Sequence, residues 1–483
     1  MLVTFYLPYM SLLDCAAIPV SVSESIQAAN VQGAILNLQR HLESSEDAPA
    51  ALLQLQGDLQ LSIGMEVDAD ESYREAQRRY VDKDLIRFTS CRNAGWQALF
   101  RSRYGTAMSC FMEVADHPNA GRALRLDALF GLFGVLFSVG RLRDADTVLD
   151  SLEALLDEAA ETGMARSTVE GWRRLVSTVG FDVETQSRLR SRPELADHVY
   201  WQVGATGTAA PRVAPQRPTT LRVLTDTIVA PVLRTRIEFL ERLTLLAGGD
   251  LAAGHAMAAH AEWAGKQGIH NYQNAVRIEM VLASLAGGCM ALAESILTLL
   301  AADMRAQQSH RQLEYLYCQA KLRYLQGQSG ESLELYTRYA QTVVSCIREE
   351  SSVLGRYSQR IARPAEQLDN IGARLPARYR RAYRYLLDNL ERKDLSIREI
   401  AAHIGVTDRA LQSAFKMSLG STPTEIIRRL RMERIRAELE ETDTVHEQGI
   451  LATAVKWGVS NRSTLITSYR REFNESPSDT LNR

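Results

Sequence analysis

Apolar residues recur every three to four positions along almost the whole chain, which is the spacing of amphipathic α-helices. Runs that alternate apolar and polar residues, as half-buried strands do, are scarce. The pattern therefore predicts an all-α protein, and its interruptions mark where one part of the chain ends and the next begins.

Two stretches break the helical pattern. Residues 203–220 read VGATGTAAPRVAPQRPTT, and their three prolines without aliphatic periodicity predict an exposed linker or long loop. Residues 360–376 carry a proline near each edge and look like a joint between two domains. The expected organisation is a helical body in two parts (1–202 and 221–360) separated by the linker (203–220), followed by a C-terminal domain (374–483).

The chain begins with an apolar segment, MLVTFYLPYMSLLDCAAIPV, and has no Lys or Arg before Arg40. Because a secretory signal needs a basic start, we expect a packing helix here. No stretch of 18 apolar residues occurs, so no membrane-spanning helix is expected. The six cysteines lie far apart without a C-x-x-C pair, which favours buried thiols in a reducing cytoplasm.

A weak internal repeat runs through the body, in which a small residue is followed at +4 and +7 by apolar or small residues. The triplets are Ala107/Phe111/Val114, Ala145/Leu149/Leu152, Gly254/Ala258/Ala261, Ala293/Leu297/Leu300 and Ser332/Tyr336/Tyr339. Since a small residue lets two helices approach closely, the pattern predicts degenerate tetratricopeptide-like helix pairs. An irregular α-bundle would show the same spacing and stays an alternative. Either body would bind proteins or pack against another copy of the chain.

Charge is distributed unevenly, although the whole chain has a net charge of only −2. Residues 374–483 contain 20 Lys and Arg against 15 Asp and Glu, whereas the rest contains 36 against 43. A basic C-terminal domain on an acidic body places an anionic partner at the C-terminus.

The first motif in this basic domain begins at Ser396, which with Glu399 forms a capping-box pattern in which each residue can bond the other's amide. The predicted helix buries Ile397, Ile400, Ala401 and Ile404, and Gly405 then allows a sharp reversal. Thr407 should cap a second helix with Leu411 and Phe415 on its inner face. This arrangement is typical of a helix-turn-helix.

The motif then repeats. Ala454, Gly458, Val459, Ser460 and Arg462 stand 53 residues after their counterparts, and Leu465, Tyr469 and Pro477 stand 54 after theirs. Each unit is followed by a cap with proline at the first helical position, at Thr422-Pro423 and Ser476-Pro477. Between the units, residues 423–439 predict one uninterrupted spacer helix of roughly 25 Å.

Each second helix leaves one face free for base edges and phosphates. The candidate DNA-binding residues are Arg409, Gln412, Ser413, Lys416, Asn461, Arg462, Ser463, Thr464, Thr467 and Arg470. Five arginines on the spacer helix (Arg428, Arg429, Arg431, Arg434 and Arg436) are expected partly to pair with Glu425, Glu433 or Glu438 and partly to face phosphates.

These residues carry a family resemblance. Residues 396–483 resemble the AraC/XylS DNA-binding domain, with its A-x3-G turn, F-K ending the first recognition helix, R-x-x-R in the spacer and a closing S-P. The segment KWGVSNRSTLITSYRREFNESPSDTLNR and the helical body resemble the AraC-type master activators of type III secretion (Hrp) genes, which lack the cupin-like sugar-binding domain of the arabinose regulator. The resemblance implies directly repeated TTCG-type half-sites and RNA polymerase as a partner.

The sequence departs from the wider family in a few places. Val459 stands where Phe is common, Leu465 where an aromatic is usual and Asn474 where Gly is usual. About five extra residues precede the second unit. The changes keep apolar character at 459 and 465, so they leave folding intact while the base preferences need not carry over.

Enzyme chemistry finds no support in the motifs. The phosphate-binding G-x-x-x-x-G-K-[ST], the zinc motif H-E-x-x-H and the nucleophile motif G-x-S-x-G are all absent from the sequence. His255 and His260 are five residues apart, so they do not share a helix face, and the acidic cluster Glu66 to Glu71 lacks calcium-loop spacing. We expect no catalytic residue, metal or cofactor.

We therefore interpret the chain as a cytoplasmic transcription activator whose partners are double-stranded DNA and RNA polymerase, with the body available for a homodimer or another protein. Two alternatives share this body. One is a protein-binding adaptor whose basic tail docks on protein, which steep salt dependence of DNA binding would exclude. The other is a small-molecule-sensing AraC-type regulator of metabolic genes, although no polar and aromatic cluster in the sequence nominates a pocket.

Overall fold

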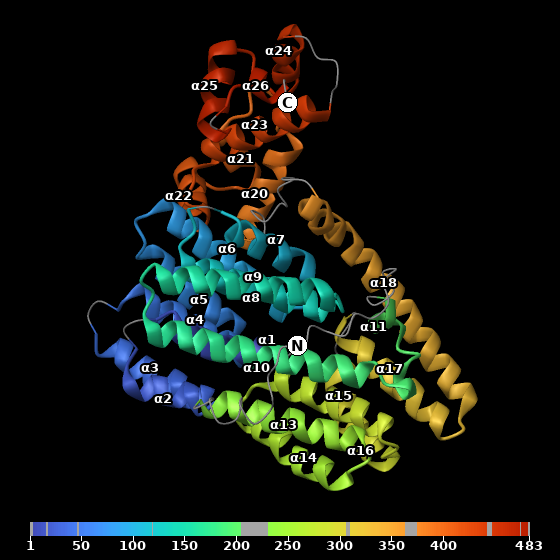
Figure 1. Cartoon of the computed structure of the whole chain (residues 1–483). Helices are drawn as coiled ribbons and strands as arrows, with labels where there is room; N and C mark the ends of the chain where they lie inside the picture. The colour runs from blue at the N-terminus through green and yellow to red at the C-terminus, as the bar shows by residue number, and fades with distance from the viewer. Residues whose placement is uncertain are drawn as a thin grey trace. The chain divides into compact units, whose positions relative to one another are not determined.

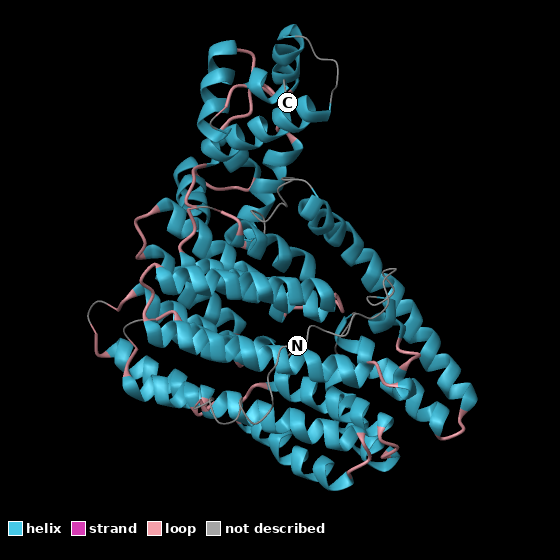
Figure 2. Cartoon of the chain, in the orientation of Figure 1, coloured by secondary structure: helices cyan, strands magenta, loops and turns pink. Residues whose placement is uncertain are grey.

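The computed structural model describes residues 3–15, 18–45, 48–117, 119–203, 230–305, 310–362, 374–441, 447–473 and 475–481. Helices and their connecting turns make up this part of the chain, and no strand occurs in it (Figure 2). The predicted all-α class is confirmed. Most of the expected linker at 203–220, and most of the joint at 360–376, lie outside the described residues.

The chain divides into two compact units. The body unit comprises Met1–Arg79 and Arg92–Leu368, and the C-terminal unit comprises Asp369–Arg483 together with Tyr80–Cys91. The two expected parts of the body therefore belong to a single unit. The short segment Tyr80–Cys91, which groups with the C-terminal unit, carries no sequence signal that would have assigned it there.

The first half of the body begins with the predicted N-terminal packing helix, α1 (Val3–Leu13), whose side chains from Val3 to Ser11 are all buried. It is followed by α2 (Val20–Gln27), α3 (Val31–Glu43), α4 (Ala50–Ser62), α5 (Glu66–Arg78), α6 (Lys83–Phe100), α7 (Tyr104–Ala115), α8 (Arg122–Ser138), α9 (Leu142–Glu161), α10 (Arg166–Arg190), the 3₁₀ turn Pro193–Leu195 and α11 (Val199–Val203). Successive helices pack side by side, as α4 does with α5 and α8 with α9 (Figure 1).

The second half of the body contains α13 (Pro231–Ala247), α14 (Leu251–Lys266), α15 (His270–Ala286), α16 (Met290–Arg305), α17 (His310–Leu325) and α18 (Ser329–Ala362). Neighbours in sequence again pack together (Figure 1). The repeat triplets fall on α7, α9, α14, α16 and α18, and those of α7, α9 and α16 are buried. The tetratricopeptide-like assignment of these pairs stays a prediction.

Two buried ion networks cross-link distant parts of the body. The Arg236 guanidinium donates to both carboxylate oxygens of Asp182, each at 2.9 Å, and to Glu279 at 3.0 Å. Arg92 bonds Asp58 and Asp127 in the same way, with Nε donating to Asp127 at 2.7 Å. A guanidinium with several donors can satisfy two carboxylates at once, so these charges hold helices together without being left unpaired.

The C-terminal unit contains the shorter helices α20 (Ala377–Asp388), α21 (Ile397–His403), α22 (Asp408–Leu419), α23 (Pro423–Glu441), α24 (Glu447–Lys456), α25 (Arg462–Phe473) and α26 (Pro477–Leu481). Its apolar side chains form two clusters. One cluster is formed by α20, α21, α22 and the start of α23. The other is formed by the rest of α23 together with α24 and α25. The unit thus has one core for each of the two motifs found in the sequence.

Candidate DNA-binding site

The first helix-turn-helix, α21 and α22, forms as the sequence predicts. Ser396 caps α21 by accepting from the Glu399 amide at 3.2 Å, and Thr407 caps α22 by accepting from the Ala410 amide at 3.2 Å. The expectation that the Glu399 side chain accepts from the Ser396 amide in return is wrong. The Glu399 carboxylate accepts instead from the Tyr385 hydroxyl at 2.7 Å and from Arg392 at 2.6 Å, and these bonds lower its pKa. The side chain therefore ties α21 back to α20.

The turns of the two units begin with the same backbone geometry. Gly405 and Gly458 both have left-handed backbones, with φ of 66° and 72°. The next residue in each turn donates its amide back into the preceding helix, from Val406 to Ala401 at 3.0 Å and from Val459 to the Ala454 carbonyl at 2.8 Å. This is the Schellman pattern, which satisfies orphan carbonyls and reverses the chain, and it needs glycine because a Cβ disfavours positive φ.

The second turn is one residue longer than the first. Ser460, the counterpart of Thr407, was expected to cap α25, and this expectation is wrong. Asn461 caps the helix instead, because its Oδ1 accepts from the amides of Ser463 at 2.8 Å and Thr464 at 3.4 Å. The extra residue explains why the spacing between the units changes from 53 to 54 at this point. Arg462 is thus the first residue of α25, whereas Arg409 is the second residue of α22.

Both predicted caps after the motifs are confirmed as reciprocal capping boxes. The Glu425 amide donates to Thr422 Oγ1 at 3.3 Å while Glu425 Oε2 accepts from the Thr422 amide at 2.7 Å. Ser476 and Asp479 exchange the same two bonds, at 3.3 and 2.8 Å. Helices α23 and α26 therefore start at Pro423 and Pro477 as expected.

The arginines of α23 mostly serve the fold. Arg429 pairs with Glu433 at 3.5 Å as expected. Arg428 instead lies 3.6 Å from Glu472, and Arg436 lies 3.3 Å from Glu475, both in the second helix-turn-helix unit. Of the five arginines expected to include phosphate contacts, Arg434 alone is exposed. The sequence could not show these pairings, because the glutamates lie about 40 residues further along.

Three arginines, of which Arg431 is on α23, close the ends of helices. Arg431 donates to the Leu390 carbonyl at 3.0 Å, to the Gly458 carbonyl at 3.4 Å and to the Arg392 carbonyl. Arg378 donates to the Gly405 carbonyl at 2.6 Å, and Arg374 to the Leu419 carbonyl at 3.3 Å. Part of the excess positive charge of this domain is therefore directed at turn carbonyls, where it fixes the two motifs.

The ten candidate DNA-binding side chains are all exposed. The four cations among them are Arg409 and Lys416 on α22, and Arg462 and Arg470 on α25. None of these four forms an ion pair or a side-chain hydrogen bond within the described chain, in contrast to the α23 arginines. The inner faces, with Leu411 and Phe415 on α22 and Leu465 and Tyr469 on α25, are fully buried or nearly so. Each helix thus presents a donor-rich face opposite a docked one, as a recognition helix requires.

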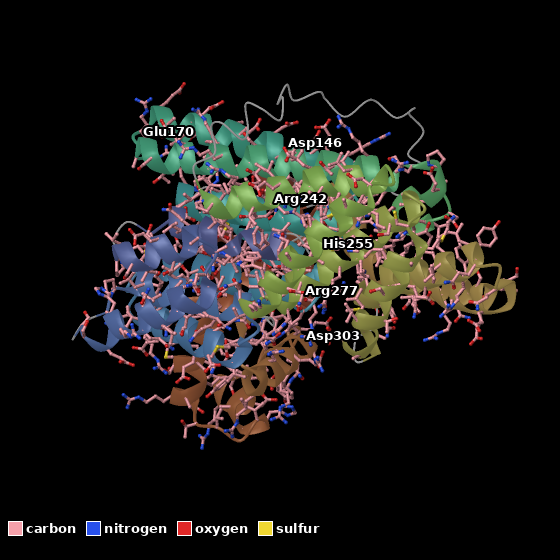
Figure 3. The ribbon with its side chains drawn as sticks, turned by 90° about the horizontal axis from the view of Figure 1, so that it is seen from below. Asp146, Glu170, Arg242, His255, Arg277 and Asp303 are labelled. Atoms are coloured by element: carbon pink, nitrogen blue, oxygen red, sulfur yellow. The ribbon has the colours of Figure 1, made fainter. Side chains whose placement is uncertain are left out.

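The two histidines of α14 and the acidic cluster from Glu66 to Glu71 do not come together as metal ligands in the described chain. His255 is exposed on α14 (Figure 3), whereas His260 is buried and lies 2.9 Å from the Tyr272 hydroxyl. In the acidic cluster, Glu66 pairs with Arg101 and Asp70 with Arg74. The described residues contain no group of three potential metal ligands, and none of their helices is long and apolar enough to cross a membrane. All six cysteines are free.

Tandem capped helix-turn-helix units with exposed, unpaired cations define a DNA-binding transcription regulator. A helix-turn-helix domain family matches residues 400–483. Regulatory protein HrpB of Ralstonia nicotianae is 35% identical over 428 residues, which cover 88% of this chain and 87% of that protein. The chain therefore belongs to the AraC/XylS family of transcription regulators, in the group that contains regulatory protein HrpB.

Other relatives match over shorter stretches of the chain. The probable thc operon regulatory protein of Rhodococcus erythropolis is 28% identical over 32% of this chain and 44% of its own. The XylDLEGF operon transcriptional activator 1 of Pseudomonas putida is 30% identical over 22% of this chain and 31% of its own. No solved structure matches. The match to HrpB is far longer than the C-terminal unit and therefore extends over much of the helical body.

Proposed function

We propose that the chain activates transcription of type III secretion genes by placing α22 and α25 in two major-groove segments of one asymmetric promoter site. The observation that carries the proposal is the contrast among the basic side chains: those on the outer faces of α22 and α25 are unpaired, while those on α23 are mostly paired. Unpaired exposed cations are available to phosphates and guanines.

The length of the spacer helix α23 supports the same proposal. Helix α23 has 19 residues, which at 1.5 Å per residue make roughly 28 Å, and a capping box fixes its N-terminal end. Successive major-groove segments on one side of DNA are about 34 Å apart. A rigid spacer of this length fits two readers one helical turn apart. RNA polymerase as the partner, self-association through the body and a cytoplasmic location belong to the same proposal and rest on the family.

The test is quantitative binding of the full chain to a promoter fragment carrying directly repeated half-sites and to random DNA, across a range of salt. Besides the two arginines assigned to bases, the exposed cations Lys416, Arg470 and Arg434 are expected at phosphates, and they predict a log–log salt slope of about −3. Footprinting should show two protected segments about one turn apart. A flat salt response would instead favour the adaptor alternative, in which the basic tail docks on protein.

A further inference from the structure

The two recognition helices, α22 and α25 (Figure 1), share one register from cap to core. Each begins with a capping side chain, Thr407 or Asn461, that accepts from a backbone amide in the first turn. Four residues after each cap comes a buried leucine, Leu411 in α22 and Leu465 in α25. Residues that stand 54 positions apart in the chain therefore occupy equivalent places on the two helices.

In this register Ile466 of α25 takes the place of Gln412 of α22, which is one of the candidate DNA-binding residues. Ile466 lies three residues after Ser463 and four residues before Arg470, so these three side chains share one face of α25. Ser463 and Arg470 are exposed, and both can donate hydrogen bonds. The side chain in the middle of this face has no hydrogen-bonding group.

The packing of the domain does not explain this isoleucine. Its neighbours Leu465 and Tyr469 are buried in the second apolar cluster, and Phe473 packs against that cluster. Ile466 is partly exposed, and it packs against neither apolar cluster of the C-terminal unit. Because an apolar side chain gains free energy when its surface leaves water, Ile466 is suited to contact with an apolar group on a partner.

The major groove of DNA offers one apolar group on the base edges. Guanine, adenine and cytosine present hydrogen-bond donors and acceptors there, whereas thymine also presents its C5-methyl group. Glutamine at the position of Gln412 can form two hydrogen bonds to adenine. Isoleucine at the equivalent position can form none, but its branched side chain can cover a methyl group. The two equivalent positions therefore suit different bases.

We propose that Ile466 is a specificity-determining residue whose side chain packs against the C5-methyl group of a thymine in the DNA segment that α25 reads. This inference rests on the proposed function, since it takes α25 to lie in the major groove. The contact excludes water from the methyl group and from the partly exposed isoleucine at the same time. Gln412 favours adenine at the equivalent place, so the two recognition helices read different bases there.

Deoxyuridine is the probe, because it lacks the C5-methyl group of thymidine and keeps the same hydrogen-bonding edge. The full-length chain first selects a duplex site from a random library, and each thymine of that site is then replaced by deoxyuridine, one at a time. At one or more thymines the affinity should fall about fourfold, which corresponds to one lost methyl contact. These thymines should lie in the segment where Arg462→Ala changes base preference.

A variant at this position ties the methyl effect to one side chain. Ile466→Ala should bind the thymine and deoxyuridine sites with equal affinity. The ratio of two affinities measured on one variant does not depend on its folded fraction, so a loss of stability would not obscure the result. Val455→Ala shortens an exposed apolar side chain on α24 and is the matched control, which should keep the fourfold ratio.

A second variant tests the register itself. Ile466→Gln places the α22 residue in α25, and it should shift the preferred base from thymine to adenine at the same position. A methyl effect that persists in Ile466→Ala, or equal affinity for thymine and deoxyuridine throughout a selected site, overturns the inference and leaves the proposed function standing. If the chain selects no site from the library, the proposed function itself fails, and this inference fails with it.

Discussion

The indole nitrogen of Trp457 donates a hydrogen bond of 2.7 Å to Glu438 Oε2, and the Trp457 ring packs against both apolar clusters of the C-terminal unit. Glu438 also accepts from Lys456 at 2.6 Å, and these two bonds, first that of Lys456, lower its pKa. One side chain at the end of α24 thus belongs to the cores of both helix-turn-helix units and is anchored to the spacer helix between them.

Replacing Trp457 should therefore uncouple the two readers. Trp457→Ala removes packing from both cores, and since the ring is partly exposed we expect a loss of about 2–3 kcal/mol in the free energy of unfolding. Affinity for a two-half-site promoter should fall much more than affinity for one half-site. Trp457→Phe keeps an aromatic ring without the indole donor and serves as the control, with a loss of about 1 kcal/mol. Equal losses on one and two half-sites would contradict this coupling.

Arg409 and Arg462 should each govern a different base pair. Each stands within the first two residues of its recognition helix, where side chains reach base edges, and arginine most often pairs with guanine. We expect Arg409→Ala and Arg462→Ala each to cost about 1–3 kcal/mol of binding and to relax preference at separate positions. Selection from a library of sites with each variant provides the measurement.

The register found for α25 sharpens that experiment. Because Arg462 aligns with Asp408 and not with Arg409 when the helix starts are superposed, Ser463 occupies the position equivalent to Arg409. Thr407→Ala is the control, since loss of the cap of α22 should lower stability by about 1 kcal/mol without moving base preference. Preference lost at one shared base pair in both arginine variants, or in neither, would show that these arginines do not read separate segments.

Arg434 and Arg431 lie three residues apart on α23 and should behave in opposite ways. Arg434 is exposed and lies over the Trp457 ring at 5.8 Å, so Arg434→Ala should lower affinity for every DNA sequence and flatten the salt slope by about 0.9. Arg431 bonds three carbonyls, and burial lowers its pKa. Arg431→Ala should instead cost about 2–3 kcal/mol of folding stability. Denaturant unfolding beside salt titrations distinguishes the two, and a salt-slope change in Arg431→Ala with intact stability would contradict the assignment.

The features that follow from local sequence were predictable. Caps at Thr407, Thr422 and Ser476 and the glycine turns at 405 and 458 all act within a few residues, so spacing alone reveals them. The cap at Asn461 was missed because Ser460 is an equally good capping residue, and only the packing of Leu465 and Tyr469 decides which of them starts the helix.

The pairings between residues far apart in the chain could not be predicted from the sequence. The contacts of Arg428 and Arg436 with Glu472 and Glu475 join residues 44 and 39 positions apart, and nothing in the periodicity of either helix specifies them. A cavity in the body unit is a stronger case, because its lining comes from seven helices spread between Tyr104 and Glu314. A pocket of that kind is a property of packing and leaves no local motif.

Stability of the body should fall as the pH drops through the range in which histidines normally gain a proton. Burial lowers the pKa of His198 to about 4 and that of His260 to about 3, against 6.5 when unfolded. Both rings are therefore neutral in the folded chain, and the unfolded chain binds more protons between those values. The stability they contribute is fully present above pH 6.5 and is lost as the pH falls toward 4. At pH 5.5 the two buried histidines together should lower the free energy of unfolding by about 2–3 kcal/mol relative to pH 7.5.

Denaturant unfolding of the full chain at these two pH values measures the effect. His260→Gln should remove about half of the pH-dependent loss, because glutamine does not titrate, even though it lowers stability at both pH values by giving up ring contacts with Phe239 and Trp263. His255→Gln is the matched control on the same helix, where the side chain is exposed (Figure 3), and it should leave the difference between the two pH values unchanged. An unchanged difference in His260→Gln, or a reduced one in His255→Gln, would show that burial of the neutral rings is not its source.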